Sequence, residues 1–229
     1  VPEQIRNLTL QTEPSKTGGL TIQFLGNTNI LLDDGETRIL TDGFFSRPSA
    51  ARLVLGKVKP NEKRIHACLE SAGISELDAV IPVHSHYDHA LDAPSVARIT
   101  GAKLIGSSST LMIGQGAGLA PEQMQLAPLD SAISIGKFNI RFIASRHWEY
   151  PSKKQCDRLL DQGITEPLLA PASIYEFKEG ISYTILIEHE GASIAIHGSA
   201  GFKENSLIDC DVDIVFLSIA GLEAMDQAY

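Results

Sequence analysis

The sequence predicts an α/β protein in which two β-sheets pack face to face, with helices outside them. The chain opens with a strand-rich half, continues through a helical stretch and ends in a second strand-rich half. Its 229 residues, 43% hydrophobic and 21% charged, are enough to bury one large core. We therefore predict a single domain over residues 1–229.

Three short strands are expected first. Leu20 to Leu25 alternates between apolar and polar residues, and Gly26 to Thr28 form a turn. The turn sequence Asp33-Asp34-Gly35-Glu36 then separates the short apolar runs at 30–32 and 38–41. These runs predict a β-meander that opens one sheet.

The next stretch alternates helices and strands. Residues 60–73 predict an amphipathic helix from Pro60 to Gly73, because apolar side chains recur there at helical spacing. The apolar run 77–83 predicts a central strand buried on both faces. A helix from Ala93, stopped by Gly101, and a strand over 103–108 follow.

The second half repeats the strand-rich plan. Residues 131–145 predict a hairpin that turns at Gly136 and Lys137, and 181–197 predict another around Glu190 and Gly191. Between them, residues 148–173 form a long loop, and such loops are usually functional or mobile. The apolar run in 211–221 predicts a last buried strand.

Composition excludes several classes of protein. Against 19 Lys and Arg stand 28 Asp and Glu, and the net charge of -9 disfavours a nucleic-acid partner. No apolar stretch reaches the roughly 18 residues that cross a bilayer. We favour a soluble, cytoplasmic protein with a small-molecule substrate, although the missing initial methionine also fits a processed N-terminus. Three scattered cysteines predict small buried hydrophobes: Cys68, Cys156 and Cys210.

The sequence HSHYDH, which begins at His84, follows the buried run directly. His84 and His86 are two positions apart, so in an extended segment their rings point to the same side and can hold one ion. Asp88 and His89 lie where the loop bends toward a helix beginning near Ala90. Imidazole and carboxylate are ligands for zinc and similar divalent ions. Two histidines lie alone elsewhere in the sequence, His66 and His189. We expect them to be ordinary surface or hydrogen-bonded core residues.

HSHYDH resembles the His-x-His-x-Asp-His motif of the metallo-β-lactamase fold superfamily, whose members are αββα four-layer sandwiches with a metal site at one edge of the two sheets. The resemblance implies that His84, His86 and the later His147 hold a first metal. Asp88 and His89 would contribute to a second. Asp42, in RILTDGFF, resembles the aspartate that supports a ligand histidine in that superfamily; the alternative is a simple turn residue.

Two departures from the family pattern follow. The family places a bridging aspartate after a late strand, where this chain reads SIAIHGSAGF, so Ser199 occupies the aspartate position and is a weaker ligand. His197 could compensate. The family's last histidine ligand has no counterpart after Gly221, so we expect that the chain lacks the C-terminal part of the domain. These departures predict fewer than two equivalents of metal per chain.

The resemblance implies a metal-dependent hydrolase in which a metal-bound hydroxide attacks an ester, lactone, amide or phosphodiester, with Asp88 orienting it. Bound metal lowers the pKa of water from about 15.7 toward about 7. We expect one or two zinc ions, with manganese or iron as alternatives. The loop carrying Trp148, Tyr150 and Lys153 is the expected wall of the substrate site.

Residues 86–108 most resemble the branch related to L-ascorbate-6-phosphate lactonase. Two rival hypotheses stay open. One is a catalytically impaired metal-binding or sensing protein of the same fold, and the other is a di-iron redox enzyme. The second would need a flavin partner, and this sequence holds no flavin fingerprint.

Overall fold

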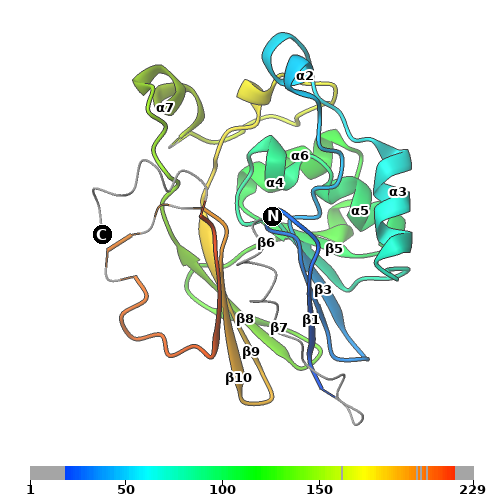
Figure 1. Ribbon diagram of the computed structural model, residues 1–229, viewed down its shortest axis with the longest axis vertical. Coiled ribbons are helices and arrows are strands. Elements are labelled where there is room, and N and C mark those ends of the chain that lie inside the picture. The colour runs from blue at the N-terminus through cyan, green and yellow to red at the C-terminus, as the bar shows by residue number, and fades with distance from the viewer. Residues whose placement is uncertain (1–18, 161, 200, 202, 205, 220–229) are drawn as a thin grey trace, which may run out of the picture.

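The computed structural model describes residues 19–160, 162–199, 201, 203–204 and 206–219 (Figure 1). Its helices are α2 (Ala50–Leu55), α3 (Glu62–Ser71), α4 (Tyr87–Ala90), α5 (Ala93–Thr100), α6 (Ser108–Gly116), α7 (Lys153–Leu159), η1 (Pro121–Gln123) and η2 (Ile174–Glu176). Its strands are β1 (Thr21–Phe24), β2 (Ile30–Asp33), β3 (Arg38–Thr41), β4 (Ala79–Ile81), β5 (Lys103–Gly106), β6 (Met124–Leu126), β7 (Ala132–Ile135), β8 (Phe138–Ala144), β9 (Tyr183–His189), β10 (Ala192–His197) and β11 (Ile214–Leu217).

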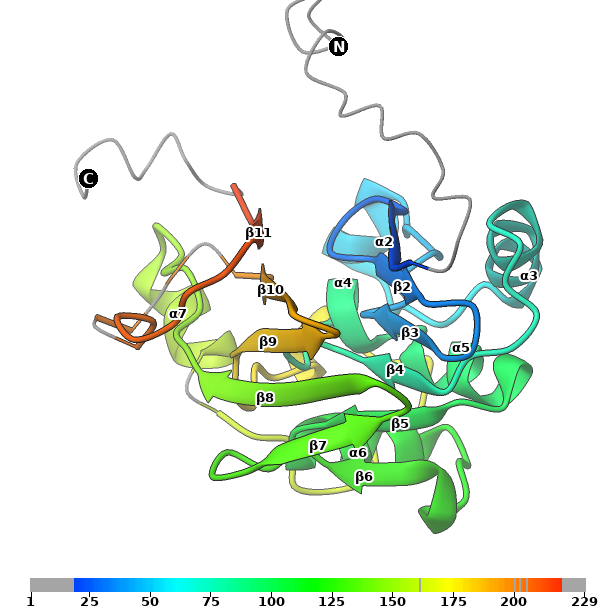
Figure 2. The same cartoon turned by 90° about the horizontal axis from the view of Figure 1, so that it is seen from below.

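The strands form two sheets. The six-stranded sheet has the order β1-β2-β3-β4-β5-β6, and the five-stranded sheet has the order β11-β10-β9-β8-β7. The meander β1 to β3 is antiparallel, while β3 to β6 run parallel because helices connect them. Seen from below, the two sheets lie face to face (Figure 2). The predicted meander and both predicted hairpins are confirmed.

Two of the apolar core clusters explain the layers. Inward-facing side chains of both sheets, among them Ile39, Phe138 and Ile185, form the core between the sheets. A second core lies between the six-stranded sheet and the helices α3 and α5, with Ile65 and Val96 in it. Period-two alternation in the strands and helical spacing in the helices supply these faces. The predicted fold class, two packed sheets with outer helices, is confirmed.

Helix boundaries differ from the prediction where capping decides them. Helix α3 begins at Glu62 because the Asn61 side chain accepts the N–H of Arg64. The predicted strand over 103–108 ends at Gly106, since Ser107 caps the unpredicted helix α6 by accepting the N–H of Thr110. The stop of α5 at Gly101, with φ of 77°, is confirmed.

Helix α4 begins at Tyr87 rather than near Ala90, so Asp88 and His89 lie on a helical turn instead of a bend before it. The long loop is also shorter than predicted, because α7 occupies Lys153–Leu159 within it. Short helices of one or two turns leave too little apolar periodicity for the sequence to reveal them.

The predicted buried strand near the C-terminus is wrong in its burial. β11 is an edge strand, and Val215 and Leu217 are 55% and 60% exposed. A short apolar run looks the same whether its strand is central or at an edge. The prediction also included 220–221, which lie outside the described residues. The three cysteines are free and half-buried instead of fully buried.

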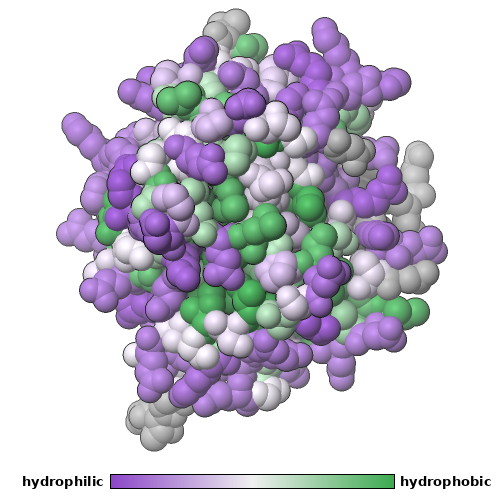
Figure 3. Space-filling view, turned by 180° about the vertical axis from the view of Figure 1, so that it is seen from behind, coloured by the Kyte–Doolittle hydropathy of each residue, from purple (hydrophilic) through white to green (hydrophobic). Residues whose placement is uncertain are grey.

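The molecular surface seen from behind has hydrophilic rims around a central area with more hydrophobic residues (Figure 3). Within the described part of the chain, no helix has the length and apolar character that crossing a bilayer requires. His66 is exposed on α3, and His189 is buried and hydrogen-bonded to Asp34 at 2.9 Å, as expected of histidines with ordinary roles.

Candidate metal centre

Three histidines from distant parts of the chain meet at one end of the sandwich. His84 and His86 follow β4, and His147 follows β8, two strands that end on the same side of the molecule. Nε2 of His84 lies 3.0 Å from Nδ1 of His86, which lies 3.2 Å from Nε2 of His147. One ligand atom from each ring falls within 4.8 Å of the others. The sequence motif therefore supplies two rings and the fold adds the third.

Backbone carbonyls orient two of these rings. His86 Nε2 lies 3.3 Å from the carbonyl oxygen of Leu159, and His147 Nδ1 lies 2.6 Å from that of Trp148. A carbonyl oxygen only accepts, so these nitrogens carry the ring protons. In neutral rings, lone pairs on the other two nitrogens then face each other at 3.2 Å. Such an arrangement is not a hydrogen bond, and a shared cation stabilises it.

The electrostatics of the cluster favour neutral imidazoles. Burial lowers the pKa of His84 well below its ordinary value, with His89 and His86 adding to the effect. Burial, followed by repulsion from His147, lowers the pKa of His86 to about 3. Neutral imidazole is the form that binds metals. Three ligands at about 2.0–2.1 Å around a tetrahedral zinc would lie about 3.3 Å apart, close to the two separations of 3.0 and 3.2 Å that His86 makes with His84 and His147. The donor set fits such an ion.

Ser85 helps to point both histidines the same way. Its N–H donates to the Glu179 carbonyl oxygen at 3.0 Å, and its hydroxyl lies 3.0 Å from that of Ser107 and 2.9 Å from that of Thr110. These partners hold Ser85 on the side of the loop away from the cluster.

His84 Nδ1 is buried and has no hydrogen-bond partner within the described residues.

Asp88 and His89 lie beside the cluster on α4. The His84 and His89 ring centroids are 4.0 Å apart, and His89 Nε2 lies 3.8 Å from the Asp88 carboxylate. His89 Nδ1 lies 2.6 Å from Asp42, which also accepts the N–H of Val83 at 2.9 Å. Burial acts to lower the pKa of His89, but Asp42 and Asp88 outweigh it and raise that pKa to about 9.

Asp42 is fully buried and has a positive φ of 54°, a region that residues other than glycine rarely adopt. Two hydrogen bonds to its carboxylate repay that strain. Of the two roles that the sequence left open, the geometry gives Asp42 a supporting contact to a histidine as well as a place in the turn after β3. The strain and the contact occur at the same residue.

Ser199 contacts the segment that carries His147, and His197 contacts the loop at Gly201 that packs against that segment. The Ser199 hydroxyl accepts the N–H of Trp148 at 3.1 Å. His197 lies 2.7 Å from the Thr184 hydroxyl and 2.7 Å from the Gly201 carbonyl oxygen. A side chain at Gly201 would meet the His147 carbonyl at 2.5 Å, so this loop packs tightly against that backbone. The two residues therefore brace the His147 segment in the structure.

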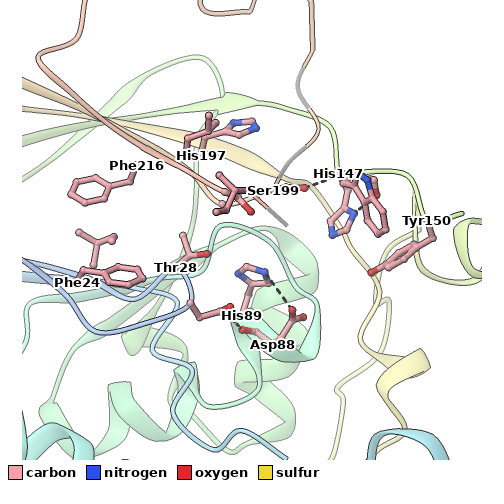
Figure 4. Close-up of a pocket in the computed structure, with 16 residues that line it drawn as sticks. Phe24, Thr28, Asp88, His89, His147, Tyr150, His197, Ser199 and Phe216 are labelled. Carbon is pink, nitrogen blue, oxygen red and sulfur yellow. Dashed lines mark hydrogen bonds and ion pairs between the residues drawn. The ribbon is translucent and has the colours of Figure 1, made fainter. Parts of the chain in front are cut away.

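A cavity of about 660 Å³ opens beside the histidines (Figure 4). Trp148 and Tyr150 line it, and the Tyr150 ring stacks on His147 with centroids 5.5 Å apart. Of the three residues expected in the wall of the substrate site, Trp148 and Tyr150 thus line this cavity. Lys153 does not, and it pairs with Asp157 at 2.8 Å on the exposed face of α7.

Several cavity residues had no signal in the sequence. Asn27 was expected only to form a turn, but its amide donates to the Asp88 carbonyl oxygen at 2.6 Å. Phe24 of β1 and Phe216 of β11 come from the two sheets and line the same side of the cavity (Figure 4). Their positions depend on how the edges of the sheets are packed, which no local pattern reports.

Known proteins resemble this chain both in sequence and in fold. The family model described as the metallo-beta-lactamase superfamily matches residues 23–163. A "UPF0173 metal-dependent hydrolase" from Heliobacterium modesticaldum is 33% identical over 88 residues, which are 38% of this chain and 30% of that protein. The chain thus matches less than a third of the length of that curated relative.

A solved structure from Parabacteroides distasonis shares the fold. It superposes with a TM-score of 0.52 at 13% identity, covering 86% of this chain and 69% of that one. The metallo-beta-lactamase fold protein YhfI from Bacillus subtilis has a TM-score of 0.47 at 15% identity, covering 89% and 64%. The family model spans more than half of the chain and includes the HSHYDH motif. The chain therefore belongs to the metallo-β-lactamase superfamily.

Proposed function

We propose that this protein is a metal-dependent hydrolase whose first metal is held by His84, His86 and His147. The observation that carries the proposal is the pair of facing lone pairs on His86 and His147, at the mouth of a cavity large enough for a small molecule. The name of the curated relative supports the same activity.

The residues around the cluster have distinct roles. A bound divalent ion would supply an acidified water and polarise the substrate oxygen. Asp88 lines the cavity with a side chain 40% exposed, so its carboxylate can orient water and accept a proton from it. In the reaction, water adds OH to the acyl or phosphoryl centre, and its proton leaves with the departing oxygen or nitrogen. The Leu159 and Trp148 carbonyls keep the ring tautomers fixed.

We further propose that a second ion binds more weakly than the first. His89 uses Nδ1 to contact Asp42 and keeps only Nε2 toward Asp88. At the position of the family's bridging carboxylate, the Ser199 hydroxyl accepts a backbone N–H. Zinc suits the three-imidazole set best, and manganese or iron are the alternatives.

Elemental analysis of the purified protein tests the metal site. We expect about one equivalent of zinc in the wild type, almost none in His86→Ala, and the wild-type amount in His66→Ala, because His66 is exposed on α3. Full metal retention in His86→Ala would contradict the site. Two full equivalents in the wild type would contradict the weak second site.

Turnover on a panel of esters, lactones, amides and bis-p-nitrophenyl phosphate tests the activity. We expect hydrolysis of at least one class by the wild type and by His66→Ala, and none by His86→Ala. A metal-loaded wild type that is inert on the whole panel would instead favour a metal-binding or sensing protein.

A further inference from the structure

We propose that residues 47–64, which we call the basic patch, dock the protein on a membrane surface of anionic phospholipid. The patch includes α2 and the start of α3, and α2 lies at the upper edge of the molecule (Figure 1). None of its residues lines the cavity beside the histidines. Docking is therefore a property separate from the proposed hydrolysis and does not depend on the metal.

The charge of the basic patch is opposite to that of the rest of the protein. Its 18 residues contain six of the 19 Lys and Arg of the chain and a single acid, Glu62. The patch carries +5 in a chain whose net charge is -9, which leaves -14 on the other residues. This asymmetry turns the patch toward an anionic surface. Salt screens charges farther away than about 10 Å, so the cations nearest the surface dominate at contact.

The cations of the patch are available to a partner. All six are exposed, and none makes an ion pair with a described acidic residue, unlike several cations elsewhere in the fold. They are Arg47, Arg52, Lys57, Lys59, Lys63 and Arg64. Glu62 is already paired with Arg98 of α5 at 2.9 Å. The acid of the patch therefore leaves the charge of these six side chains in place.

Backbone pairing displays Lys57 and Lys59 together. Val58 between them is buried, and it exchanges two backbone hydrogen bonds with Ala172, at 2.7 and 3.0 Å. Successive side chains of an extended segment point to opposite sides, so the burial of Val58 turns both lysines outward. The pairing also places the segment around Ala172 beside the patch.

Apolar side chains are exposed among these charges. Val54 of α2 is 79% exposed and Leu169 is 71% exposed, which makes them two of the three most exposed large hydrophobic residues in the described chain. Their neighbours Leu53 and Leu168 pack on the same apolar cluster. Exposed aliphatic side chains surrounded by Lys and Arg are typical of surfaces that bind an anionic bilayer, because the apolar groups enter the interface while the cations contact phosphates.

The same features favour a lipid surface over nucleic acid. Single-stranded nucleic acid is bound by stacking on aromatic side chains, and residues 47–64 include no Phe, Tyr or Trp. Nucleic acid also offers Val54 and Leu169 no apolar interior to enter, whereas the acyl region of a bilayer does.

Vesicle flotation of the zinc-loaded chain tests the docking. The probes are vesicles of phosphatidylcholine alone and vesicles that also contain about 30% phosphatidylglycerol. We expect binding only to the anionic vesicles, and a loss of affinity of at least about tenfold when NaCl is raised from about 0.1 M to about 0.5 M. His86→Ala should bind like the wild type, because the patch does not contact the histidine cluster.

Charge variants locate the binding surface. Lys57→Gln combined with Lys59→Gln should weaken binding to anionic vesicles by about 25-fold, which is about fivefold for each charge. The matched control is Lys103→Gln combined with Arg141→Gln, two exposed cations on β5 and β8, and it should leave binding unchanged. Circular dichroism checks that the variants fold.

Two further variants separate the apolar and the acidic contributions. Val54→Ala combined with Leu169→Ala should weaken binding by about tenfold or more, because less apolar surface leaves water. Glu62→Gln removes the acid of the patch, keeps an acceptor for Arg98, and should tighten binding by about fivefold.

Several outcomes would overturn the proposal. They are equal binding to neutral and anionic vesicles, no binding to either, or the same loss in the control pair as in the lysine pair. Tighter binding to a transfer RNA than to anionic vesicles would assign the patch to nucleic acid instead. A salt-sensitive dimer in sedimentation velocity that the lysine pair abolishes would assign it to the acidic surface of a second copy. Vesicle binding together with inertness on the substrate panel would leave docking standing and contradict the hydrolase.

Discussion

At the scale of single residues, Asp42 shows how one side chain can fix the position of another. It is fully buried, and its two carboxylate oxygens contact the Val83 N–H and His89 Nδ1. Because Asp42 is fully buried, both donors also lie away from solvent. If the carboxylate is removed, both donors are left buried without an acceptor, which costs about 1–3 kcal/mol each.

We therefore expect Asp42→Ala to lower the free energy of unfolding of metal-free protein by about 3 kcal/mol or more. Asp42→Asn, which keeps one carbonyl acceptor, should lose less. Urea denaturation followed by circular dichroism measures both. Asp157→Ala is the matched control, because Asp157 pairs with Lys153 on the surface and should lose less than about 1 kcal/mol. Equal losses at the two aspartates would show that Asp42 is only a turn residue.

At the scale of elements, α6 depends on a close backbone contact. A Cβ at Gly116 would lie 1.9 Å from the Leu168 carbonyl oxygen, whereas a Cβ at Gly118 would meet nothing within 4 Å. The Leu168 N–H in turn donates to the Met112 carbonyl oxygen at 3.0 Å. The segment around Leu168 is therefore packed directly on the last turns of α6.

Gly116→Ala should destabilise the protein by about 2–3 kcal/mol, because backbone atoms must move to make room. Gly118→Ala should cost about 1–2 kcal/mol, from its positive φ of 77° alone. Hydrogen exchange separates the two mechanisms. The Leu168 amide should exchange faster in Gly116→Ala and at the wild-type rate in Gly118→Ala, and unchanged protection in both would refute the packing argument.

At the scale of the whole molecule, a hydrogen-bonded Asp–His pair joins the two sheets at the end away from the histidine cluster. Asp34, in the turn after β2, lies 2.9 Å from Nε2 of His189 at the end of β9. The side chain of Asp34 is 2% exposed and that of His189 is 4% exposed. Burial acts to raise the pKa of Asp34, but hydrogen bonds from His189, Thr37 and Glu36 outweigh it and lower that pKa to about 2.

This pair predicts a pH dependence of stability. The folded-state pKa lies below the unfolded value of 3.8, so the stabilisation is complete above about pH 4 and is lost as pH falls toward about 2. We expect about 1–2 kcal/mol, since solvent near the turn screens part of the effect. Asp34→Asn should lower stability at pH 7 by this amount and flatten the acid limb between pH 4 and about 2 in urea titrations. An acid limb identical to the wild type would contradict the pair's contribution.

The proposed metal binding would also be a property of the whole fold, because its three histidines follow β4 and β8, which belong to different sheets. Zinc at 100 times its dissociation constant should add about 2.7 kcal/mol, which raises Tm by roughly 5–10 °C for a chain of this size. Differential scanning fluorimetry with and without EDTA measures this shift. It should vanish in His147→Ala and persist in His66→Ala, and an equal shift in both variants would point to binding elsewhere.

Much of the fold was predictable because local sequence patterns indicate its strands and helices. Alternation gave the meander and the hairpins, and helical spacing gave α3 and α5. α6 and α7 escaped, since α6 is capped within a run of serines and α7 is a short polar helix. The apolar sequence of β11 predicted a buried strand. That prediction failed because an apolar run does not indicate whether a strand has a neighbour on both sides.

The sequence by itself predicted the family and four of the candidate metal ligands, since HSHYDH places imidazoles and a carboxylate within a few residues of one another after a buried strand. Only the tertiary structure decided how His147 faces His86, how Asp42 reaches His89, and that Phe24 and Phe216 share one cavity. A local motif determines only the relative positions of residues that are close in the sequence. Contacts between sheets depend on packing of the entire core, which brings together residues more than a hundred positions apart.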